Sequence, residues 1–232
     1  MNYYLKVSIE GIVIFSSVLA SFFLNNRNEV SKDIDVKNQY VGDLVMILEE
    51  DINQMESLMT ILFESEELIN EIQNDIDAGH TLLSDREAVD KLLGIEVGTS
   101  FFTNDGVFTQ MIATGSLDLV SNKTLVENLL EMYNHNKDRN TAISVEIDQF
   151  NREFKYSVLS KFRIRFEYNL LEGEFYGTRK LTSYNFDESY YLSNEFYGLL
   201  SQAKTYSNMY KRHLSDIKAL YNESKLLAEN EL

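Results

Sequence analysis

Histidine is the side chain best suited to acid–base and metal chemistry near neutral pH, and this chain contains three: His80, His135 and His213. Glu131 and His135 are four residues apart, so a helix would place them on one face. A metal site needs more converging ligands than this pair, and the sequence lacks the Glu-x-x-His motif of di-iron helical bundles. We therefore expect solvated polar residues here and no metal site.

The run Asp-Ile-Asp-Ala-Gly at residues 75–79 is reminiscent of a calcium loop. Its glycine falls one position early for an EF-hand, and Arg86 occupies the position that requires glutamate. The sequence also lacks a P-loop, a dinucleotide-binding fingerprint and a Gly-x-Ser-x-Gly elbow. It has no cysteine, which excludes thiolate catalysis, disulfides and cysteine-based metal sites. These absences predict a protein that is not an enzyme and binds no cofactor.

The overall composition favours helices. With 232 residues, 44% of them hydrophobic, the chain can bury the core of one large domain or two small ones. It has no proline and only 10 glycines, so the residues that usually interrupt helices are scarce. Its net charge of -16 argues against nucleic-acid binding, because phosphate contacts need clustered cations. We expect an all-α fold and no nucleic-acid partner.

Charge is distributed unevenly along the chain. Between Lys37 and Lys91 there are 14 acidic residues and one basic residue, Arg86, whereas cations concentrate between Arg152 and Lys180. Three interpretations stay open: a solvated face with loose complementarity between helices, an acidic flank that docks a basic partner, or weak binding of divalent cations.

The N-terminal segment has the length and composition of a membrane span. Gly11 to Leu24 is 14 residues without a charge, and extension back to Leu5 gives 20 residues, about 30 Å of helix. Lys6 can reach the interface, and Glu10 lies near one end, so it costs less than the roughly 2.5–3.5 kcal/mol of a central charge. A cleaved signal peptide and a buried soluble helix are the alternatives. We predict a membrane anchor over residues 1–29, with its span at about 5–24.

The orientation of this anchor is weakly encoded, because Lys6 on one side faces Arg27 and Lys32 on the other. A very short head followed by a long domain favours export of the domain. We therefore expect a single-pass protein of the inner membrane, with residues 30–232 in the periplasm.

From Val30 to Ile76, apolar residues recur mostly in steps of three or four, with doubled steps across Lys37 and Glu66, which predicts a helix over 30–76 that continues from the span. Ser84 and Glu87 form a capping box that opens a helix over 84–93. Further helices are predicted over 104–113, 121–167 and 187–230. Residues 161–168 also alternate like a strand; helix is preferred there, and strand stays open. The helix lengths predict an elongated, coiled-coil-like, up-down bundle with one interrupted helix.

A structural joint is predicted between two of these helices. Gly115 can take a positive φ and end a helix, Leu117 and Leu119 can fill the core, and Ser121, followed by Asn122, can cap the next helix. A ligand site at this position is the alternative.

Two stretches resemble an uncharacterised family of bacterial envelope proteins, catalogued as a domain of unknown function. Residues 9–12 and 24–29 are similar to its anchor, in which a Gly-Glu pair precedes the span and Asn-Asn-Trp-Asn-Glu follows it. Residues 113–125 are similar to its small-Gly-x-Leu-x-Leu-Ile-x-Asn-x-x-Leu motif. Arg27 replaces the tryptophan, Gly11 follows Glu10, and the usual basic N-terminal tail is missing. The resemblance implies an anchor and an envelope location, and it implies no activity.

Two functions compete. The first is an accessory or scaffold subunit of a membrane complex, and the second is a sensory ligand-binding module that signals through a membrane partner. Glu10, Ser17 and Ser21 are candidate contacts with such a partner, since intramembrane carboxylates often face a protein neighbour and small-xxx-small pairs allow close helix approach. Ser16 and Ala20 form a second such pair. The expected partners are the lipid bilayer and either another protein or a second copy of the chain.

Overall fold

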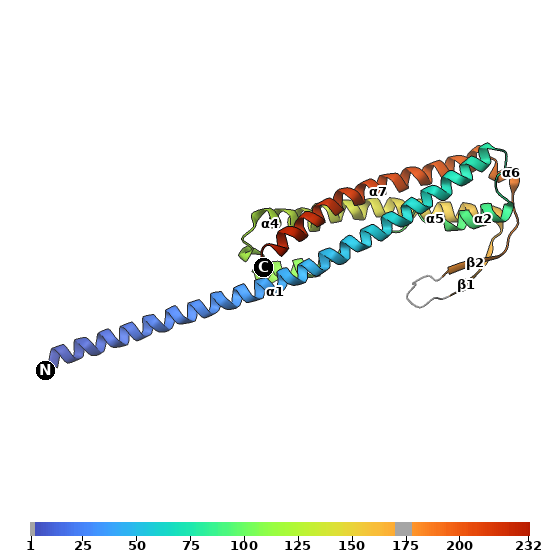
Figure 1. Cartoon of the computed structure of the whole chain (residues 1–232). Helices are drawn as coiled ribbons and strands as arrows, with labels where there is room; N and C mark the ends of the chain where they lie inside the picture. Colours follow the sequence, from blue (N-terminus) through green and yellow to red (C-terminus); the bar gives the residue numbers. More distant parts are fainter. Residues whose placement is uncertain (1–2, 170–177) are drawn as a thin grey trace. The chain divides into compact units, whose positions relative to one another are not determined.

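The computed structural model describes the backbone of residues 3–169 and 178–232 and the side chains of residues 12–167 and 180–232 (Figure 1). The described chain is mostly helical, as predicted, and it also contains a two-stranded antiparallel hairpin, which the all-α prediction missed. Two compact units make up the chain. Unit 1 comprises Met1–Glu49, Asn104–Leu130 and Glu223–Leu232, and unit 2 comprises Glu50–Thr103 and Glu131–Asn222.

A single helix, α1 (Tyr3–Asp77), contributes residues to both units and is 75 residues long. The chain has no proline that could interrupt it. The helix ends because Gly79 and His80 take φ angles of 71° and 59°, and their amides close the last turn in the two hydrogen bonds of a Schellman motif. The prediction of an unbroken helix that continues from the N-terminal segment to Ile76 is confirmed.

From residue 41 onward, α1 buries one narrow stripe. Most of its buried positions alternate in steps of three and four residues, which is the heptad repeat of a coiled coil, and Ile52 and Asp75 are buried beside them. Asp51 and Ser65 belong to this stripe although both are polar. The predicted core residues Val30 and Ile34 are instead 51% and 46% exposed, because residues 12–36 of α1 are exposed throughout the described chain. The members of the stripe are Val41, Leu44, Leu48, Asp51, Met55, Leu58, Leu62, Ser65, Ile69, Ile72 and Ile76.

Helix α7 (Asn194–Glu229) carries a matching stripe. The apolar pattern of this helix predicts Leu199 and Tyr206 as core residues, but Leu200 and Ser207 occupy the stripe instead, because its positions keep the heptad spacing. The predicted helix over 187–230 is divided, since a short helix, α6 (Glu188–Tyr191), precedes α7. The buried stripe of α7 consists of Phe196, Leu200, Ala203, Ser207, Tyr210, Leu214, Ile217, Tyr221, Ser224 and Ala228.

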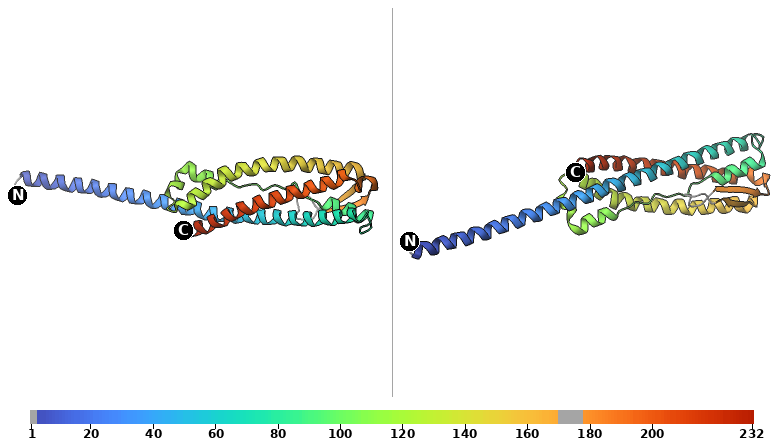
Figure 2. Two further views of the ribbon diagram at one scale, coloured as in Figure 1. Left: turned by 90° about the horizontal axis from the view of Figure 1, so that it is seen from above. Right: turned by 60° about the horizontal axis from the view of Figure 1, so that its bottom comes forward.

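Four lysines of α7, spaced seven residues apart, each pair with a polar side chain of α1. Within unit 2, both views of Figure 2 show these two helices side by side. The pairs there are Lys204–Asn70 (2.6 Å), Lys211–Glu66 and Lys218–Glu56 (2.6 Å), and the pair within unit 1 is Lys225–Glu49 (3.4 Å). The more exposed pairs, Lys218–Glu56 and Lys225–Glu49, contribute only about 0.2–1 kcal/mol each, so their main effect is to specify the antiparallel register.

Unit 2 also contains α2 (Asp85–Gly94), α5 (Lys137–Phe162), β1 (Arg165–Asn169) and β2 (Thr178–Ser183). The prediction that this helix continues to residue 167 is wrong, because α5 ends at Phe162 and Arg163 takes a φ of 41°. The alternating pattern of 161–168 instead forms β1, which pairs with β2 and places Phe166 opposite the buried Leu181. The sequence also predicts a connection at Gly173 and Gly177 before the last helix, and these two residues lie outside the described part of the chain.

An extended segment, residues 95–103, follows α2 and is partly buried within unit 2. Helix α2 itself begins at the predicted capping box. No described strand pairs with the segment, and side chains of α1, α5 and α7 satisfy several of its backbone groups. Ser65 bonds both backbone groups of Glu96 (2.9 and 3.2 Å), the Phe101 and Phe102 amides donate to Tyr210 (2.6 Å) and Gln54 (3.3 Å), and Asn140 donates to the Phe101 carbonyl (2.8 Å).

Unit 1 combines the first part of α1 with α3 (Gly106–Thr114), a 3-10 turn (Ser116–Leu119), α4 (Lys123–Leu130) and the last turns of α7. Helix α3 matches the predicted 104–113 within two residues. The long helix predicted over 121–167 is divided into α4, a π-helical segment (Glu131–Asn136) and α5. The core of unit 1 includes the buried side chains of Leu44, Leu48, Phe108, Met111, Leu125 and Leu129.

The extended segment of unit 2 generates a testable prediction at Gly98. A Cβ atom at this position would lie 2.6 Å from the Cβ of Asn151, which rotation of the asparagine side chain cannot relieve. Gly98→Ala should therefore lower the free energy of unfolding by about 1–3 kcal/mol, measured by urea denaturation in detergent micelles. Gly198→Ala is the matched control, because a Cβ there meets nothing within 4 Å and alanine is the better helix former, so it should stabilise by up to about 1 kcal/mol. Equal effects of the two substitutions would contradict this packing.

Candidate functional site

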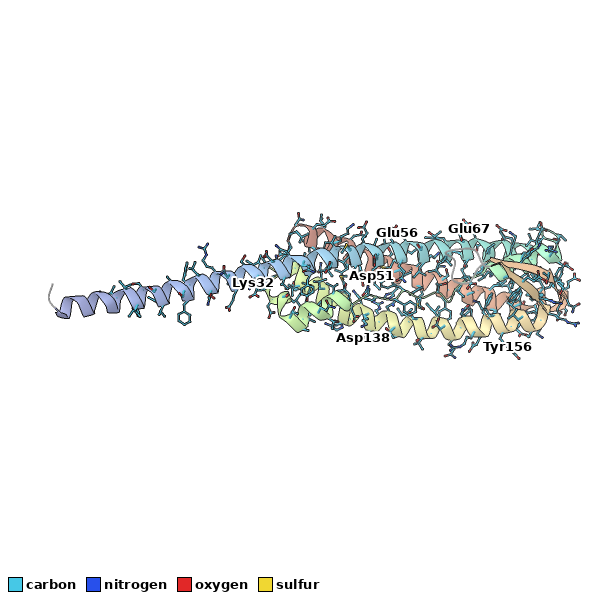
Figure 3. The ribbon with its side chains drawn as sticks, turned by 90° about the horizontal axis from the view of Figure 1, so that it is seen from below. Lys32, Asp51, Glu56, Glu67, Asp138 and Tyr156 are labelled. Carbon is cyan, nitrogen blue, oxygen red and sulfur yellow. The ribbon has the colours of Figure 1, made fainter. Side chains whose placement is uncertain are left out.

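The apolar N-terminal part of α1 is fully exposed in the described chain. Nine large apolar side chains between Ile12 and Leu24 are 48–69% exposed, and they include the consecutive residues 12–15, which point to all sides of a helix. Figure 3 shows side chains projecting from this part of α1 before Lys32. Among the residues with described side chains, no helix is both long and apolar enough for a membrane span. The predicted span at 5–24 begins with residues 5–11, whose side chains lie outside the description.

The predicted intramembrane contacts fall partly within this segment. The Ser17 hydroxyl donates to the Val13 carbonyl (2.8 Å), and the Ser21 hydroxyl donates to the Ser17 carbonyl (2.9 Å). Both hydroxyls are therefore satisfied within their own helix, as serines in membrane helices often are. The side chain of Glu10 lies outside the description.

The predicted joint forms a turn in unit 1. Gly115 takes a φ of 73° and caps the end of α3, in agreement with the predicted positive φ. The assignment of Leu117 and Leu119 to the core is wrong: Leu119 is 45% exposed and Leu117 is half-buried. Ser116 and Val120 are buried instead, because the 3-10 turn changes which residues face inward.

The end of this joint holds a carboxylate. The Glu231 side chain accepts hydrogen bonds from the Ser121 amide (2.9 Å), the Ser121 hydroxyl (2.8 Å) and the Asn122 amide (3.1 Å) at the start of α4. Lys37 of α1 lies 3.0 Å from the same carboxylate and also donates to the Glu231 carbonyl (3.2 Å). The cap of α4 is Asn122, whose Oδ1 accepts from the Leu125 amide, and not the predicted Ser121, whose hydroxyl donates to Glu231. We call the group formed by Lys37, Ser121, Asn122 and Glu231 the carboxylate clasp.

The electrostatics of the carboxylate clasp follow from its donors. The side chains of Lys37 and Glu231 are only 9% and 4% exposed, so neither charge is well hydrated. Burial opposes ionisation of Glu231, but the hydrogen bonds from Ser121, Lys37 and Asn122 outweigh burial and lower the pKa of Glu231 to about 2. The predicted joint is thus the place where three distant segments of unit 1 are held together.

A second polar cluster closes the far end of α1 in unit 2. The buried Asp75 accepts hydrogen bonds from His80 Nδ1 (2.6 Å), the Tyr191 hydroxyl (2.8 Å) and the amides of Leu82 and Leu83 (2.7 and 2.9 Å). The other ring nitrogen of His80 is 3.0 Å from Asp85. The His80 ring also stacks on Phe186 and contacts the Tyr191 ring edge, each at 4.8 Å.

These contacts explain the ionisation of the cluster. Burial lowers the pKa of His80, but the hydrogen bonds to Asp75 and Asp85 outweigh burial and raise it. Burial likewise opposes ionisation of Asp75, whose hydrogen bonds from His80, Leu83 and Tyr191 keep its pKa below the usual range. An Asp–His pair is also part of hydrolase triads, but here the second ring nitrogen faces a carboxylate and not a nucleophile. The cluster therefore acts as a cap for α1, and we call the group formed by Asp75, His80, Asp85 and Tyr191 the Asp75 cap.

A cavity of about 210 Å³ lies between α2, α5 and β1 in unit 2. It is smaller than the roughly 300–1,000 Å³ of typical ligand pockets. Its one charged lining residue, Lys155, is 3.0 Å from Glu96, so its charge is already compensated. Among the described residues, no group of His, Asp or Glu side chains is arranged to hold a metal ion. The lining residues are Leu92, Leu93, Ile95, Phe154, Lys155, Val158, Leu159 and Phe166.

No family model, curated protein or solved structure matches the chain. The resemblance of residues 9–29 and 113–125 to the envelope-protein family therefore stays a proposal.

Sequence reasoning identified Ser121 and Asn122 but missed Lys37, Glu231 and the Asp75 cap. One signal was present for Lys37, since it continues the heptad spacing of α1 toward the N-terminus. Glu231 carried no signal, because 194 residues separate it from Lys37. His80 was recognised as a candidate, but its partners Asp75 and Asp85 lie five residues to either side, which is not a helical contact spacing.

The carboxylate clasp predicts an acid-sensitive stability. The Glu231 carboxyl contributes stability above its ordinary pKa of 4.5 that is lost as the pH falls toward about 2, worth about 3 kcal/mol. Glu231→Gln should remove about 2–4 kcal/mol at pH 7, because it leaves the buried Lys37 without its counter-charge. The measurement is urea unfolding in detergent micelles, supported by faster amide exchange at residues 121–125. Glu229→Gln, whose carboxylate is exposed, should change stability by less than about 0.5 kcal/mol; an equal loss there would contradict the clasp.

The Asp75 cap predicts the opposite pH dependence. Because the folded pKa of His80 is raised, its contribution is complete below the unfolded value of about 6.5 and is lost as the pH rises through the folded pKa. His80→Asn keeps a side chain that tolerates positive φ, so its cost reports on the lost ion pairs. We expect a loss of about 1.5–3 kcal/mol at pH 5.5 and a clearly smaller loss at pH 9, measured by urea unfolding. A loss that is independent of pH would show that His80 contributes through packing alone.

Proposed function

We propose that the chain is a membrane-anchored helical envelope protein, an accessory, scaffold or interaction subunit of a membrane complex. In this proposal residues 5–24 cross the inner membrane, α1 continues into an up-down helical bundle, and residues 30–232 lie in the periplasm. The observation that carries the proposal is the exposure of nine large apolar side chains on all sides of α1 between Ile12 and Leu24. A helix that is apolar all round needs an apolar environment.

The energetic balance supports an anchor. Each large apolar side chain gains about 1.5–3 kcal/mol on leaving water. Nine of them outweigh the penalty for Glu10, which is less than the roughly 2.5–3.5 kcal/mol of a charge at the membrane centre. The hydroxyls of Ser17 and Ser21 add little further cost, because both already donate to carbonyl groups of α1.

The polar groups of the described residues favour a scaffold over a sensor or an enzyme. The most strongly hydrogen-bonded ionisable groups, Asp75, His80 and Glu231, hold segments of their own unit together. The cavity in unit 2 is small and its lysine is paired. Glu10 stays the proposed contact with a protein neighbour inside the membrane. Purification in mild detergent separates the alternatives, because a scaffold retains a protein partner and a sensor retains a small molecule.

The proposed topology is tested with single cysteines, for which the cysteine-free chain gives no background. Ser183 is exposed at the end of β2, so Ser183→Cys should react with a membrane-impermeant maleimide in intact spheroplasts. Asn2→Cys is the control and should react only after lysis. The protein should also stay in the membrane pellet after an alkaline carbonate wash. Labelling of Ser183→Cys only after lysis would reverse the orientation, and release by carbonate would exclude the anchor.

A further inference from the structure

The buried stripe of α1 continues beyond the part that the chain itself covers. Counting back from Val41 in the same alternation of three and four residues gives an uninterrupted series of heptad positions. Their side chains from Val13 to Ile34 are exposed, including Phe23 at 62%, Val30 at 51% and Ile34 at 46%. The series, which we call the exposed seam, is Val13, Ser16, Ala20, Phe23, Arg27, Val30 and Ile34.

We propose that the exposed seam is a homodimer interface, in which α1 of a second copy packs in parallel against α1 of the first. This inference rests on the proposed anchor and names its partner. A second copy fits because two anchors inserted in the same direction place identical seams at identical depth. The seam is also continuous with the intrachain interface, since Val41 begins the buried stripe in the same heptad phase.

Lys37 marks the boundary between the two interfaces. It is the heptad position between Ile34 and Val41, and its ammonium group is turned to the Glu231 carboxylate at 3.0 Å. The chain therefore covers its own seam from this residue onward, and toward the N-terminus the seam is left for another helix.

The flanks of the seam are compatible with a parallel pair. Val30 occupies a d position and Ile34 the following a position. Asp33, at the g position between them, would face Asn38 at the next e position of the other copy, so no like charges meet there. Arg27 is the one charge within the seam, and its guanidinium lies 5.7 Å from the Phe23 ring centre in the same helix.

The seam also distinguishes between the two small-residue pairs of the anchor. Ser16 and Ala20 both lie on the seam, whereas Ser21 lies off it. Ser17 and Ser21 donate to their own helix, and Ser16 makes no hydrogen bond within the described part of the chain. The close helix contact within the membrane is thus assigned to Ser16 and Ala20, with the Ser16 hydroxyl available to the other copy.

Disulfide crosslinking in native membranes tests this interface. Val30→Cys and Ile34→Cys lie on the seam, and Lys32→Cys and Asp35→Cys are matched controls on the opposite face of the same two turns. Oxidation with copper phenanthroline should give at least roughly five-fold more dimer from the seam variants, because a disulfide needs Cα atoms within about 7 Å. Equal dimer from all four variants would overturn the interface, as would a crosslinked species that contains a different protein.

The same samples test the dimer proposal and the anchor proposal independently. Retention after carbonate washing without crosslinking at the seam would refute the dimer and leave the anchor intact. Release by carbonate would refute the anchor, and crosslinking of the released protein would still decide the interface. As a second measurement, Ile34→Asn should raise the dimer dissociation constant in detergent about ten-fold, by light scattering, while Lys32→Asn leaves it unchanged. An unchanged constant for Ile34→Asn would also overturn the proposal, and an unchanged circular dichroism spectrum shows that the variant is folded.

Discussion

Helix α1 buries a stripe of two residues in each heptad, and the other elements depend on this constraint. A stripe with steps of three and four residues can only be covered by elements that run along the helix, and in each unit a section of α7 does so. The lysines of α7 then select one register among those that the apolar contacts alone would allow. Because Lys204, Lys211 and Lys218 repeat every seven residues, a shift by one turn would separate them from their acceptors in unit 2.

Polar residues inside this stripe decide what else unit 2 can bury. Ser65 on α1 bonds both backbone groups of Glu96, and Tyr210 on α7 accepts from the amide of Phe101. An all-apolar stripe would leave these backbone groups unsatisfied, at a cost of about 1–3 kcal/mol each. The segment 95–103 can therefore lie in the interior without regular secondary structure. Gly98 completes the arrangement by allowing the backbone to approach Asn151.

The acidic charge of the chain is only partly used within the fold. Lys91, Lys211, Lys218 and Lys225 neutralise four carboxylates of α1, which agrees with loose complementarity between helices. The carboxylate clasp is different, since burial and four donors make it specific. It also binds α1 at Lys37, and the described side chains of α1 before Lys37 are exposed.

The sequence by itself determined the long helix α1, the start of α2 and the position of α3, because periodicity and a capping box are local signals. It also placed a joint after Gly115, although the cap of the next helix is Asn122 and not the predicted Ser121. Tertiary structure decided the rest. The sequence could not distinguish a strand from a helix at 165–169, since either structure would bury Phe162 and Phe166 to some degree. The pairing with β2 decides for the strand. Asp51, Ser65 and Ser207 entered the buried stripe because distant groups satisfy them, and Glu231 reached Lys37 because folding brought two ends of the chain together. Such pairings depend on contacts across the fold, and no local pattern encodes them.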